Sequence, residues 1–455
     1  MSPVVNTRTR RKGRTFEFLL VSYLVVNIAI ALTIAEVAPV PSLTTTINGN
    51  ISPEVVWEKT YGGNGDDRVF YVTKTDDGYL VVGSSTSNSK NKTVAWVLNL
   101  GFDGEVLWNR TYLESTGGEF RYALKMDDTF LLVGNVLESS GEQDGCAVKI
   151  DENGTLLWKT TIDRAGVDKL FSATTDDDDF ILAGLTSSID ASNLDAWVIR
   201  LDGKGNVLWN MTYGSAQDDV ARGISLLGND LYVVCGYTNS MGEGDYDFWI
   251  FELDGSGKVI WNRTFGGLRS DKAYAIATHE QECIIVGDTQ SRGAGNSDAW
   301  IIKVNSCGEL VWQKTLGGLD FDSAVCITAS GKGCLLGGFS LSFGNGMRDI
   351  WLSKIDLEGN VQWSFALGRT GYEEAYGIVG LEDEALVVGG WTDFAGQGRY
   401  DYYVARLNVE LNSSGELCWI VFIAFLGILL LIFSIVVLTR RNKSAVRSLD
   451  SDLLV

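Results

Sequence analysis

Hydrophobic and polar residues alternate in short runs along this chain, and residues 219–265 show the pattern clearly. Runs rich in β-branched and aromatic residues are separated there by Gly, Asn, Asp and Ser, which predicts strands joined by tight turns. The strands are expected at Val220–Leu227, Leu231–Tyr237, Phe248–Leu253 and Val259–Phe265. Between the two ends of the chain no stretch of about 12 residues has a helical period. The pattern therefore predicts an all-β protein.

The same four-stranded unit recurs along the chain, marked by a tryptophan in the expected fourth strand. The seven tryptophans are spaced by 50 to 52 residues and are Trp57, Trp108, Trp158, Trp209, Trp261, Trp312 and Trp363. Tandem units of this kind are typical of the blades of a β-propeller. The first copy begins at its fourth strand, Val55–Tyr61, and the last stops after its third, Tyr402–Leu407. We therefore expect a seven-bladed β-propeller over residues 54–409, closed by an N-terminal strand.

Two other positions repeat with the tryptophan. The third strand carries Trp96, Trp197, Trp249, Trp300 and Trp351, with Cys146 and Tyr403 in the two remaining copies. The second strand carries Gly83, Gly134, Gly184, Gly236, Gly287, Gly338 and Gly389. Large rings bury apolar area and fix the spacing of blades. A glycine inside a strand usually indicates close approach of a neighbouring backbone.

Carboxylates repeat in two sets. One residue opens each innermost strand, ten or eleven positions after the tryptophan: Asp67, Glu119, Asp168, Asp219, Asp271, Asp322 and Glu373. A second set opens the third strand in six copies, where Val94 stands in the seventh: Asp144, Asp195, Asp247, Asp298, Asp349 and Asp401. In a propeller both sets fall on one face, so we expect a nearly complete double ring of carboxylates there.

Two interpretations of this double ring remain open. An aspartate at the start of a strand can accept backbone N–H bonds and close a tight loop, so the repetition would serve folding. Carboxylates together with backbone carbonyls are also the ligands that Ca²⁺ prefers, which makes the first set candidate cation sites. No copy contains the DxDxDG pattern of a calcium loop, and no other cofactor is expected.

Both ends of the chain are hydrophobic. Residues 1–38 hold a basic stretch and then an apolar one, which predicts either a cleaved signal peptide or a retained signal anchor. Residues 417–438 carry no charge and are long enough for a transmembrane helix, and the tail 439–455 opens with basic residues. The positive-inside rule places this tail in the cytoplasm and the propeller outside the cell membrane. Residues 39–53, rich in Pro and Thr, and 410–416 are expected linkers.

The net charge of −21 makes nucleic acid an improbable partner, because an acidic surface repels phosphate. The six cysteines of the repeats show no zinc-binding spacing; Cys326 and Cys334 lie on successive strands, where a hairpin disulfide is conceivable. His279 is the only histidine, which excludes a Ser-His-Asp triad elsewhere in the chain. Glycosylation motifs suit an exported protein and occur at Asn50, Asn91, Asn109, Asn153, Asn210, Asn262 and Asn412.

The segments WEKTYGGNGDDRVFYVTKTDDGYLVVGSSTS and DAWIIKVNSCGELVWQKTLGG carry the repeat most fully. They resemble the seven-bladed propeller repeats of archaeal and bacterial surface proteins, and the resemblance covers residues 54–408. It implies display outside the cytoplasm and brings no catalytic residues. The segment LDGKGNVLW also resembles the tryptophan-docking motif of quinone-dependent enzymes, but those have eight blades.

The sequence therefore predicts a membrane-anchored interaction module that binds a protein, glycan or envelope partner through an acidic loop face. A structural protein of the cell envelope is one alternative. A propeller enzyme, glycoside-active or quinone-dependent, is the other, because a pair of carboxylates is sufficient for glycoside hydrolysis. Sevenfold repetition argues against one unique pair, so an enzyme is not the expected function.

Overall fold

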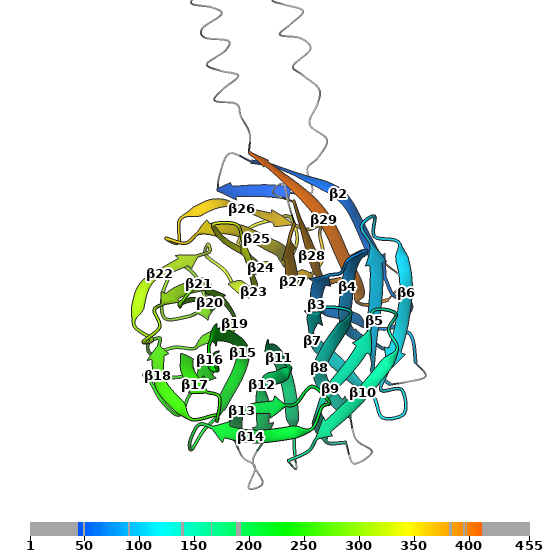
Figure 1. Ribbon diagram of the computed structural model, residues 1–455. Coiled ribbons are helices and arrows are strands. Elements are labelled where there is room, and N and C mark those ends of the chain that lie inside the picture. The colour runs from blue at the N-terminus through cyan, green and yellow to red at the C-terminus, as the bar shows by residue number, and fades with distance from the viewer. Residues whose placement is uncertain are drawn as a thin grey trace, which may run out of the picture. The chain divides into compact units, whose positions relative to one another are not determined.

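The computed structural model describes residues 44–48, 51–89, 92–137, 141–164, 166–187, 193–381, 385–394, 396 and 398–411. The chain divides into two units, Met1–Leu43 and Thr44–Val455, and all described residues belong to the second. These residues form strands β1 to β29 and no helix. They build seven antiparallel sheets around a central channel, with one strand of each sheet innermost (Figure 1).

Each sheet is one blade, and we number the blades along the chain. Blade 1 holds β3 (Asp67–Lys74), β4 (Gly78–Ser85), β5 (Val94–Gly101) and β6 (Val106–Tyr112), and blade 2 holds β7 (Gly118–Met126), β8 (Thr129–Leu137), β9 (Gln143–Asp151) and β10 (Leu156–Ile162). Blade 3 holds β11 (Asp168–Asp176), β12 (Asp179–Ser187), β13 (Leu194–Leu201) and β14 (Val207–Tyr213), and blade 4 holds β15 (Asp219–Gly228), β16 (Leu231–Thr238), β17 (Asp247–Asp254) and β18 (Val259–Phe265). Blade 5 holds β19 (Asp271–His279), β20 (Glu282–Thr289), β21 (Asp298–Val304) and β22 (Leu310–Leu316). The four strands expected in residues 219–265 are confirmed within two residues at each end.

Blades 6 and 7 contain the N-terminal strands. Blade 6 holds β23 (Asp322–Ser330), β24 (Gly333–Ser340), β25 (Asp349–Asp356), β26 (Val361–Leu367) and a fifth strand, β1 (Thr44–Asn48). Blade 7 holds β27 (Glu373–Gly380), β28 (Ala385–Thr392), β29 (Asp401–Leu411) and β2 (Ile51–Tyr61). The expected closure by an N-terminal strand is confirmed, because β2 pairs with β29 from Ile51↔Leu411 to Tyr61↔Tyr402.

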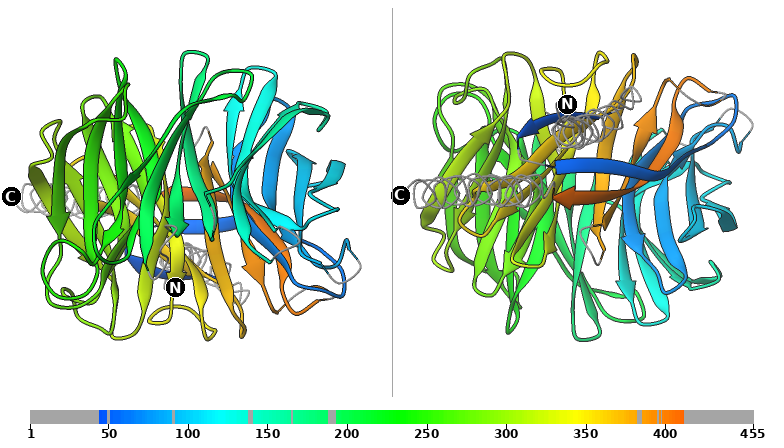
Figure 2. Two further views of the ribbon diagram at one scale, coloured as in Figure 1. Left: turned by 90° about the horizontal axis from the view of Figure 1, so that it is seen from below. Right: turned by 90° about the horizontal axis from the view of Figure 1, so that it is seen from above.

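The hydrophobic core lies between neighbouring sheets. The second strand of a blade is buried over most of its length, and over all of it in β4, because other blades cover both of its faces. One cluster joins Leu80 and Val97 of blade 1 to Phe120 and Leu132 of blade 2, and similar clusters fill other junctions. The side views show the sheets packed face to face around the ring (Figure 2).

The glycine of the second strand faces a β-bulge in the innermost strand of the same blade. In blade 1, Gly83 pairs with Val69 and the register shifts directly afterwards. A Cβ on Gly83 would lie 2.0 Å from the carbonyl oxygen of Arg68, and the other blades repeat this contact. In blade 7 the residue in this position is Gly390, since its Cβ would lie 1.8 Å from the oxygen of Glu374. Gly389, which the sequence predicts for this position, lies one residue too early.

The fourth-strand tryptophan joins each blade to the next. Its indole N–H donates to a carbonyl in the turn between the third and fourth strands of the following blade, at 3.0–3.2 Å. The acceptors are Phe102, Glu152, Gly203, Gly255, Ser306 and Leu357. A glycine of that turn, such as Gly308 with φ +72°, lies against the indole, where a Cβ would come within 2.5 Å. The third-strand tryptophans are buried, so both sets serve packing, as expected.

The contact between blades 6 and 7 departs from this pattern. Blade 7 has no turn after its third strand, because its fourth strand comes from the other end of the chain. Trp363 therefore meets no such turn, and its buried indole N–H has no acceptor among the described residues. Instead, β1 pairs with β26 along the outer edge of blade 6. Thr44–Asn48 thus form a strand inside the segment expected to be a linker.

The cysteines of the propeller do not pair. Cys326 lies opposite Gly337 and Cys334 lies opposite Ala329, so the register of the hairpin keeps the two thiols apart. Both are free and buried, which corrects the hairpin disulfide considered from the sequence. Burial raises the pKa of both thiols, that of Cys326 to about 12. They serve as small apolar residues of the core.

Candidate functional site

The two faces of the ring differ in their connections. The loops between second and third strands and the segments that connect one blade to the next emerge on one side, which we call the loop face. The turns between first and second strands and between third and fourth strands lie on the other side, the turn face. Both sets of repeated carboxylates lie at the loop face, as the sequence predicts.

The carboxylate of the first strand fastens the segment that enters its blade. It accepts a hydrogen bond from the backbone N–H four residues earlier, at 2.7–3.0 Å in Asp67, Asp168, Asp219, Asp322 and Glu373. Asp322 also accepts from the Ser342 hydroxyl at 2.6 Å, which ties down the loop that follows its own second strand. Asp271 lacks the first bond but accepts from the Thr289 hydroxyl.

The carboxylate of the third strand caps the loop that precedes it. Asp247 accepts from the backbone N–H of Glu243 at 2.6 Å, and Asp298 accepts from that of Ala294 at 2.9 Å. Asp349 and Asp401 make the same bond to the N–H three residues earlier. Closing tight turns is what aspartate does in Asx-turns, so this geometry supports the folding interpretation.

Members of the first set do not meet one another. Each of them except Glu119 lies at a junction where the preceding blade supplies a third-strand carboxylate. A glycine lies between the two at several junctions: a Cβ on Gly317 would lie 2.2 Å from Asp298 Oδ1 and 2.8 Å from Asp322 Oδ2. Gly62, Gly266 and Gly368 hold the same position. This glycine is the first of the repeated Gly-Gly pair, so the motif makes room for two acids.

The junction between blades 1 and 2 has lost all three residues together. Gly118 takes the place of the first-strand carboxylate, Val94 that of the third-strand carboxylate, and Leu113, with φ 63°, that of the glycine. Glu119, expected in the first set, lies one position further and forms an ion pair with Arg121 at 2.6 Å. Gly118 stands at the usual spacing of ten residues after Trp108, so Glu119 is the next residue along the strand and not the repeat position. At this junction the glycine is thus absent together with the two carboxylates that it would separate.

The junction between blades 2 and 3 has gained a carboxylate instead of losing any. Asp163 stands where the glycine is expected, so Asp144 and Asp168 gain a third carboxylate, with ligand atoms of all three within 4.8 Å of one another. Asp168 is fully buried, and its Oδ1 has no hydrogen-bond partner among the described residues. Burial, and further the charge of Asp163, raises the pKa of Asp168. Within the described part of the chain, this group fits a hard cation best.

The double ring contributes little exposed charge. All of its carboxylates except Glu119 and Asp195 are buried. Burial, and then the charge of Asp271, raises the pKa of Asp247 to about 6. Exposed acids gather instead in turns of the turn face, at Asp76, Asp77, Asp127, Asp128, Asp177 and Asp178. The carboxylate repeat therefore does not create the acidic loop face expected from the sequence.

Exposed apolar side chains mark the loop face of blades 5 to 7. Leu268 and Leu319, in the segments that enter blades 5 and 6, are 81 % and 80 % exposed. Met347 and Phe394, in the loops of blades 6 and 7, are 59 % and 48 % exposed. Arginines accompany them at Arg269, Arg292, Arg348, Arg369 and Arg399. Two exposed acids, Asp320 and Asp393, lie among them. Apolar and basic side chains predominate in this part of the loop face, and we call it the apolar-basic surface.

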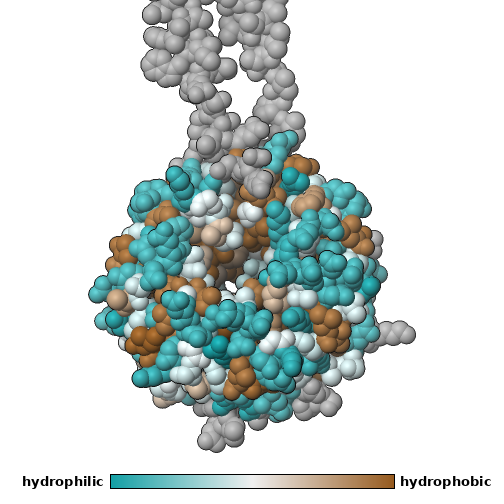
Figure 3. Space-filling model, viewed as in Figure 1, coloured by the Kyte–Doolittle hydropathy of each residue, from teal (hydrophilic) through white to brown (hydrophobic). Residues whose placement is uncertain are grey.

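The central channel is lined by the bulged residue of each innermost strand. Going round the ring these residues are Phe70, Arg121, Phe171, Arg222, Tyr274, Val325 and Tyr376. They border a cavity of about 110 Å³ to which all seven innermost strands contribute, and a space-filling view shows the hollow at the centre of the ring (Figure 3). Each arginine lies over the aromatic ring of the preceding blade, 3.8 Å from Phe70 for Arg121 and 4.2 Å from Phe171 for Arg222.

Sequence reasoning did not find this channel ring. Its members lie 13 residues after each fourth-strand tryptophan, where the chemistry of the residue varies from blade to blade. Their neighbours two positions earlier are also polar or charged in most blades, for example Arg68, Lys169 and Lys272. The variability of this position inside an otherwise regular repeat was the one sequence signal that could have pointed to these channel residues. The bulge that turns it toward the channel depends on strand pairing and leaves no mark in the sequence alone.

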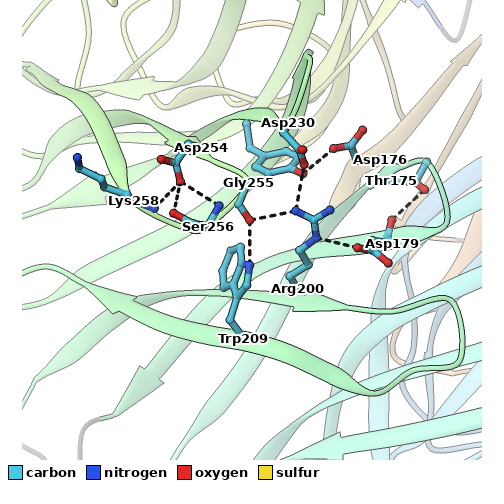
Figure 4. A network of polar contacts seen from close by, with 11 residues as sticks. Thr175, Asp176, Asp179, Arg200, Trp209, Asp230, Asp254, Gly255, Ser256 and Lys258 are labelled. Atoms are coloured by element: carbon cyan, nitrogen blue, oxygen red, sulfur yellow. Dashed lines mark hydrogen bonds and ion pairs between the residues drawn. The ribbon is translucent and has the colours of Figure 1, made fainter.

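The turn face carries its own polar network between blades 3 and 4 (Figure 4). Arg200 donates to Asp179 at 2.8 Å, and to Asp230 and the Gly255 carbonyl at 3.0 Å. The Trp209 indole reaches the same carbonyl at 3.1 Å. These contacts join two turns of blade 4 to the third and fourth strands of blade 3, which is a structural role.

The glycosylation motifs divide by position. Asn109, Asn153, Asn210 and Asn262 are exposed, and three of them lie on the fourth strands β6, β14 and β18 at the outer edge of their blades. Asn50, Asn91 and Asn412 lie outside the described residues, as do the predicted segments 1–38 and 417–438. Among the residues that the structure describes, no helix is long and apolar enough to cross a membrane.

The sheets and their closure define a seven-bladed β-propeller. No protein-family model and no curated protein matches the chain in sequence. Among solved structures, the Pan2 WD40 domain of Neurospora crassa is similar with a TM-score of 0.49 and 11 % identity over 79 % of this chain and 96 % of that domain. The β-propeller domain of the Trilobed protease from Pyrococcus furiosus gives a TM-score of 0.44 and 9 % identity over 77 % and 94 %. At these identities the likeness concerns the fold alone.

Proposed function

We propose that this propeller is a membrane-anchored, extracytoplasmic interaction module that binds a protein partner through the apolar-basic surface. The observation that carries the proposal is the exposure of Leu268 and Leu319 on neighbouring connecting segments. Contiguous exposed apolar residues on a soluble domain mark interaction sites, since they cost free energy in water. The capping carboxylates hold the surrounding loops in place, so the surface is preformed.

The chemistry of the surface favours an acidic protein partner over a glycan. Leucine and methionine pack against apolar side chains, whereas sugars are bound mainly through hydrogen bonds and aromatic stacking. Arg269 is exposed and has no ion pair within the described part of the chain, so it is available to a carboxylate. Arg369 and Arg348 are partly engaged by Glu58 and Glu374. A partner with apolar residues flanked by acids fits this surface.

Photo-crosslinking in intact cells tests the proposal. A photoreactive residue replaces Leu268 or Leu319 and, as a control, Leu107 or Leu208 on the outer rim, which are 52 % and 53 % exposed. We expect one discrete protein adduct from the loop-face positions, reduced by Arg269→Glu, and none from the rim. Equal labelling from both regions, or no adduct from Leu268 and Leu319, would contradict the proposed surface.

The membrane anchoring is tested separately. Protease added to intact cells should digest the propeller and spare an epitope placed after Val455, because the tail is predicted to be cytoplasmic. Digestion of the epitope, or protection of the propeller, would overturn the predicted orientation. The intact mass of the purified chain then shows whether the exposed motifs at Asn109, Asn210 and Asn262 carry glycans.

A further inference from the structure

Arg222 stands in the central channel without an acidic partner. Its guanidinium lies 4.2 Å from the centre of the Phe171 ring and 5.6 Å from that of Tyr274. No described residue accepts a hydrogen bond from it, and its Nε is buried. An arginine stacked between rings is held in one orientation, and its unused N–H groups remain a fork that matches a carboxylate. A buried donor without an acceptor is uncommon in a folded protein and requires an explanation.

The acids near Arg222 already have partners. Glu119 is engaged by Arg121, and Glu374 by Arg348. Glu374 also accepts from the Tyr376 hydroxyl at 2.8 Å, and Asp288 accepts from the Tyr274 hydroxyl at 3.0 Å. The wall of the channel therefore offers an unpaired cation, although the whole chain has a net charge of −21.

Lys169 adds to this positive region. Burial, and then the charges of Arg121 and Arg222, lowers the pKa of Lys169, while Glu119 acts in the opposite direction. Two of the lysine's neighbours are thus cations from the adjacent blades. An anion that entered between blades 2 and 4 would reduce the repulsion among these three side chains.

The residues that line the cavity determine which ligand groups, besides the anionic one, can be bound there. The cavity of about 110 Å³ is partly open to the channel, so its volume does not limit a ligand that extends along the channel. Aromatic rings of Phe70, Phe171 and Tyr274 and the aliphatic chains of Ile224 and Ile276 line it. Polar atoms make up more of the cavity wall than apolar ones, so a ligand there meets hydrogen-bonding groups as well as the aromatic rings.

We propose that the central cavity binds a small carboxylate with an apolar, planar body, whose carboxylate pairs with Arg222 and whose body contacts the aromatic ring of residues around the channel. This site is separate from the apolar-basic surface, and neither depends on the other. Its ligand enters along the channel, so a protein bound at the loop face would control access without forming the site.

Calorimetric titration of the purified full-length protein tests the site with sodium benzoate. Benzamide, of the same shape but neutral, is the paired probe. We expect benzoate to bind at least about ten-fold more tightly than benzamide, because a charge-assisted bidentate pair is stronger than neutral hydrogen bonds. Equal binding of the two probes, or no benzoate binding, would overturn the proposal.

Substitutions of Arg222 test whether this residue binds the benzoate. Arg222→Met keeps an apolar contact with Phe171 and should reduce benzoate affinity to that of benzamide. Arg222→Lys keeps the charge and loses the fork, so it should bind with an intermediate affinity and covers the case in which the Met variant fails to fold. Arg263→Met is the matched control, since Arg263 also lies over a ring, 5.9 Å from that of Trp261, but on the outer strand β18. Unchanged affinity in both Arg222 variants would place the binding elsewhere.

Sulfate distinguishes a general anion site from the proposed one. At the same ionic strength, sulfate should displace benzoate only weakly, because sulfate has no planar body to contact the aromatic rings of the cavity. If sulfate competes as strongly as benzoate binds, the proposal that the ligand has an apolar, planar body is overturned. Chemical modification of Arg222 by phenylglyoxal gives a second readout, which benzoate should slow and benzamide should not.

Discussion

On both the loop face and the turn face, regularly spaced aspartates accept backbone N–H bonds and close turns. The aspartates of the loop face are buried, whereas those of the turn face are closer to solvent. At the loop face, Asp247 accepts backbone N–H bonds while buried, and burial is the largest cause that raises its pKa to about 6. At the turn face, Asp151 accepts from the N–H of Thr155 and Asn153 while partly exposed, and the bond from Thr155 is the largest cause that lowers its pKa. A repeated aspartate therefore reports a turn, but not whether its charge is available to a ligand.

The faces also differ in how neighbouring blades are joined. At the loop face, acceptors on the strands bind donors in the connecting segments. At the turn face, the tryptophan of each fourth strand donates to a carbonyl of the next blade, except at blades 6 and 7. Because the carboxylates that accept the loop-face bonds are buried, we expect the stability of the ring to depend more on these bonds.

The largest difference is expected between Asp322 and Asp356. Asp322→Ala removes a buried acceptor of the Gly318 N–H and the Ser340 and Ser342 hydroxyls, which should cost about 2–3 kcal/mol. Asp356→Ala removes exposed bonds from Glu358 and Asn360, whose groups can turn to water, so the loss should be clearly smaller. Denaturant unfolding of both variants measures the difference. Equal losses would show that the two faces contribute alike.

The dependence of stability on pH should reverse between the faces. The folded pKa of about 6 for Asp247 lies above the unfolded value, so the folded state binds more protons between pH 4 and 6. Stability should therefore rise as the pH falls from 7 to 5, by on the order of 1 kcal/mol for this group. Below the unfolded pKa of aspartate, protonation of Asp151, Asp202 and Asp254, whose pKa values are lowered, should reduce stability again.

Asp247→Asn isolates this effect. Unfolding free energies at pH 7 and pH 5 should differ less in Asp247→Asn than in the unmodified chain. Asp254→Asn is the matched variant on the turn face and should leave the difference between pH 7 and 5 unchanged. A stability that falls steadily from pH 7 to 5 in the unmodified chain would contradict the raised pKa at the loop face.

The tryptophan contacts of the turn face should each contribute about 1 kcal/mol through the indole hydrogen bond. Trp158→Phe removes the N–H that reaches the Gly203 carbonyl at 3.2 Å. Trp363→Phe removes a buried N–H that has no acceptor among the described residues, so only packing is lost. We therefore expect the indole-specific loss at Trp158 alone. Replacement by naphthylalanine, which keeps two fused rings without the N–H, separates packing from hydrogen bonding in both positions.

The ring and its closure could be predicted from the sequence because they depend on local patterns. Short apolar runs bounded by turn residues located strands such as β15 and β16 within one residue at each end. The fifth strand β1 was not expected, although the sequence held a signal. The outer strand of blade 6 reads Trp363-Ser-Phe-Ala-Leu. Most other copies have a charged or amide side chain in place of Ser and a basic one in place of Phe, whereas Ser364 and Phe365 are buried. An apolar outer edge indicates a covering strand.

The residues of the candidate sites were harder to predict, for two physical reasons. Counting from the tryptophan assumes that every copy has the same length, and one added residue between Glu373 and Gly390 makes Gly390, not Gly389, the equivalent of Gly83. Glu119 was assigned because it is the acid nearest the expected place, although Gly118 stands at the usual spacing. The channel ring depends on a bulge, which arises from pairing between strands and not from any local preference of Arg222 or Tyr274. Spacing alone therefore predicts the frame better than the direction in which a side chain points.

The smallest expected effect concerns calcium at the junction of blades 2 and 3. Asp144, Asp163 and Asp168 form a group in which Asp163 replaces the glycine of the repeat, so Asp163→Gly restores the ordinary junction. Calcium that binds the folded state should stabilise the unmodified chain by about 0.4 kcal/mol at a concentration equal to Kd. Calorimetry with calcium and with chelator should show this rise in Tm, and Asp163→Gly should abolish it. A rise that persists in Asp163→Gly would assign the ion to the ordinary carboxylate pairs, and no rise would leave turn closure as the sole role of both rings.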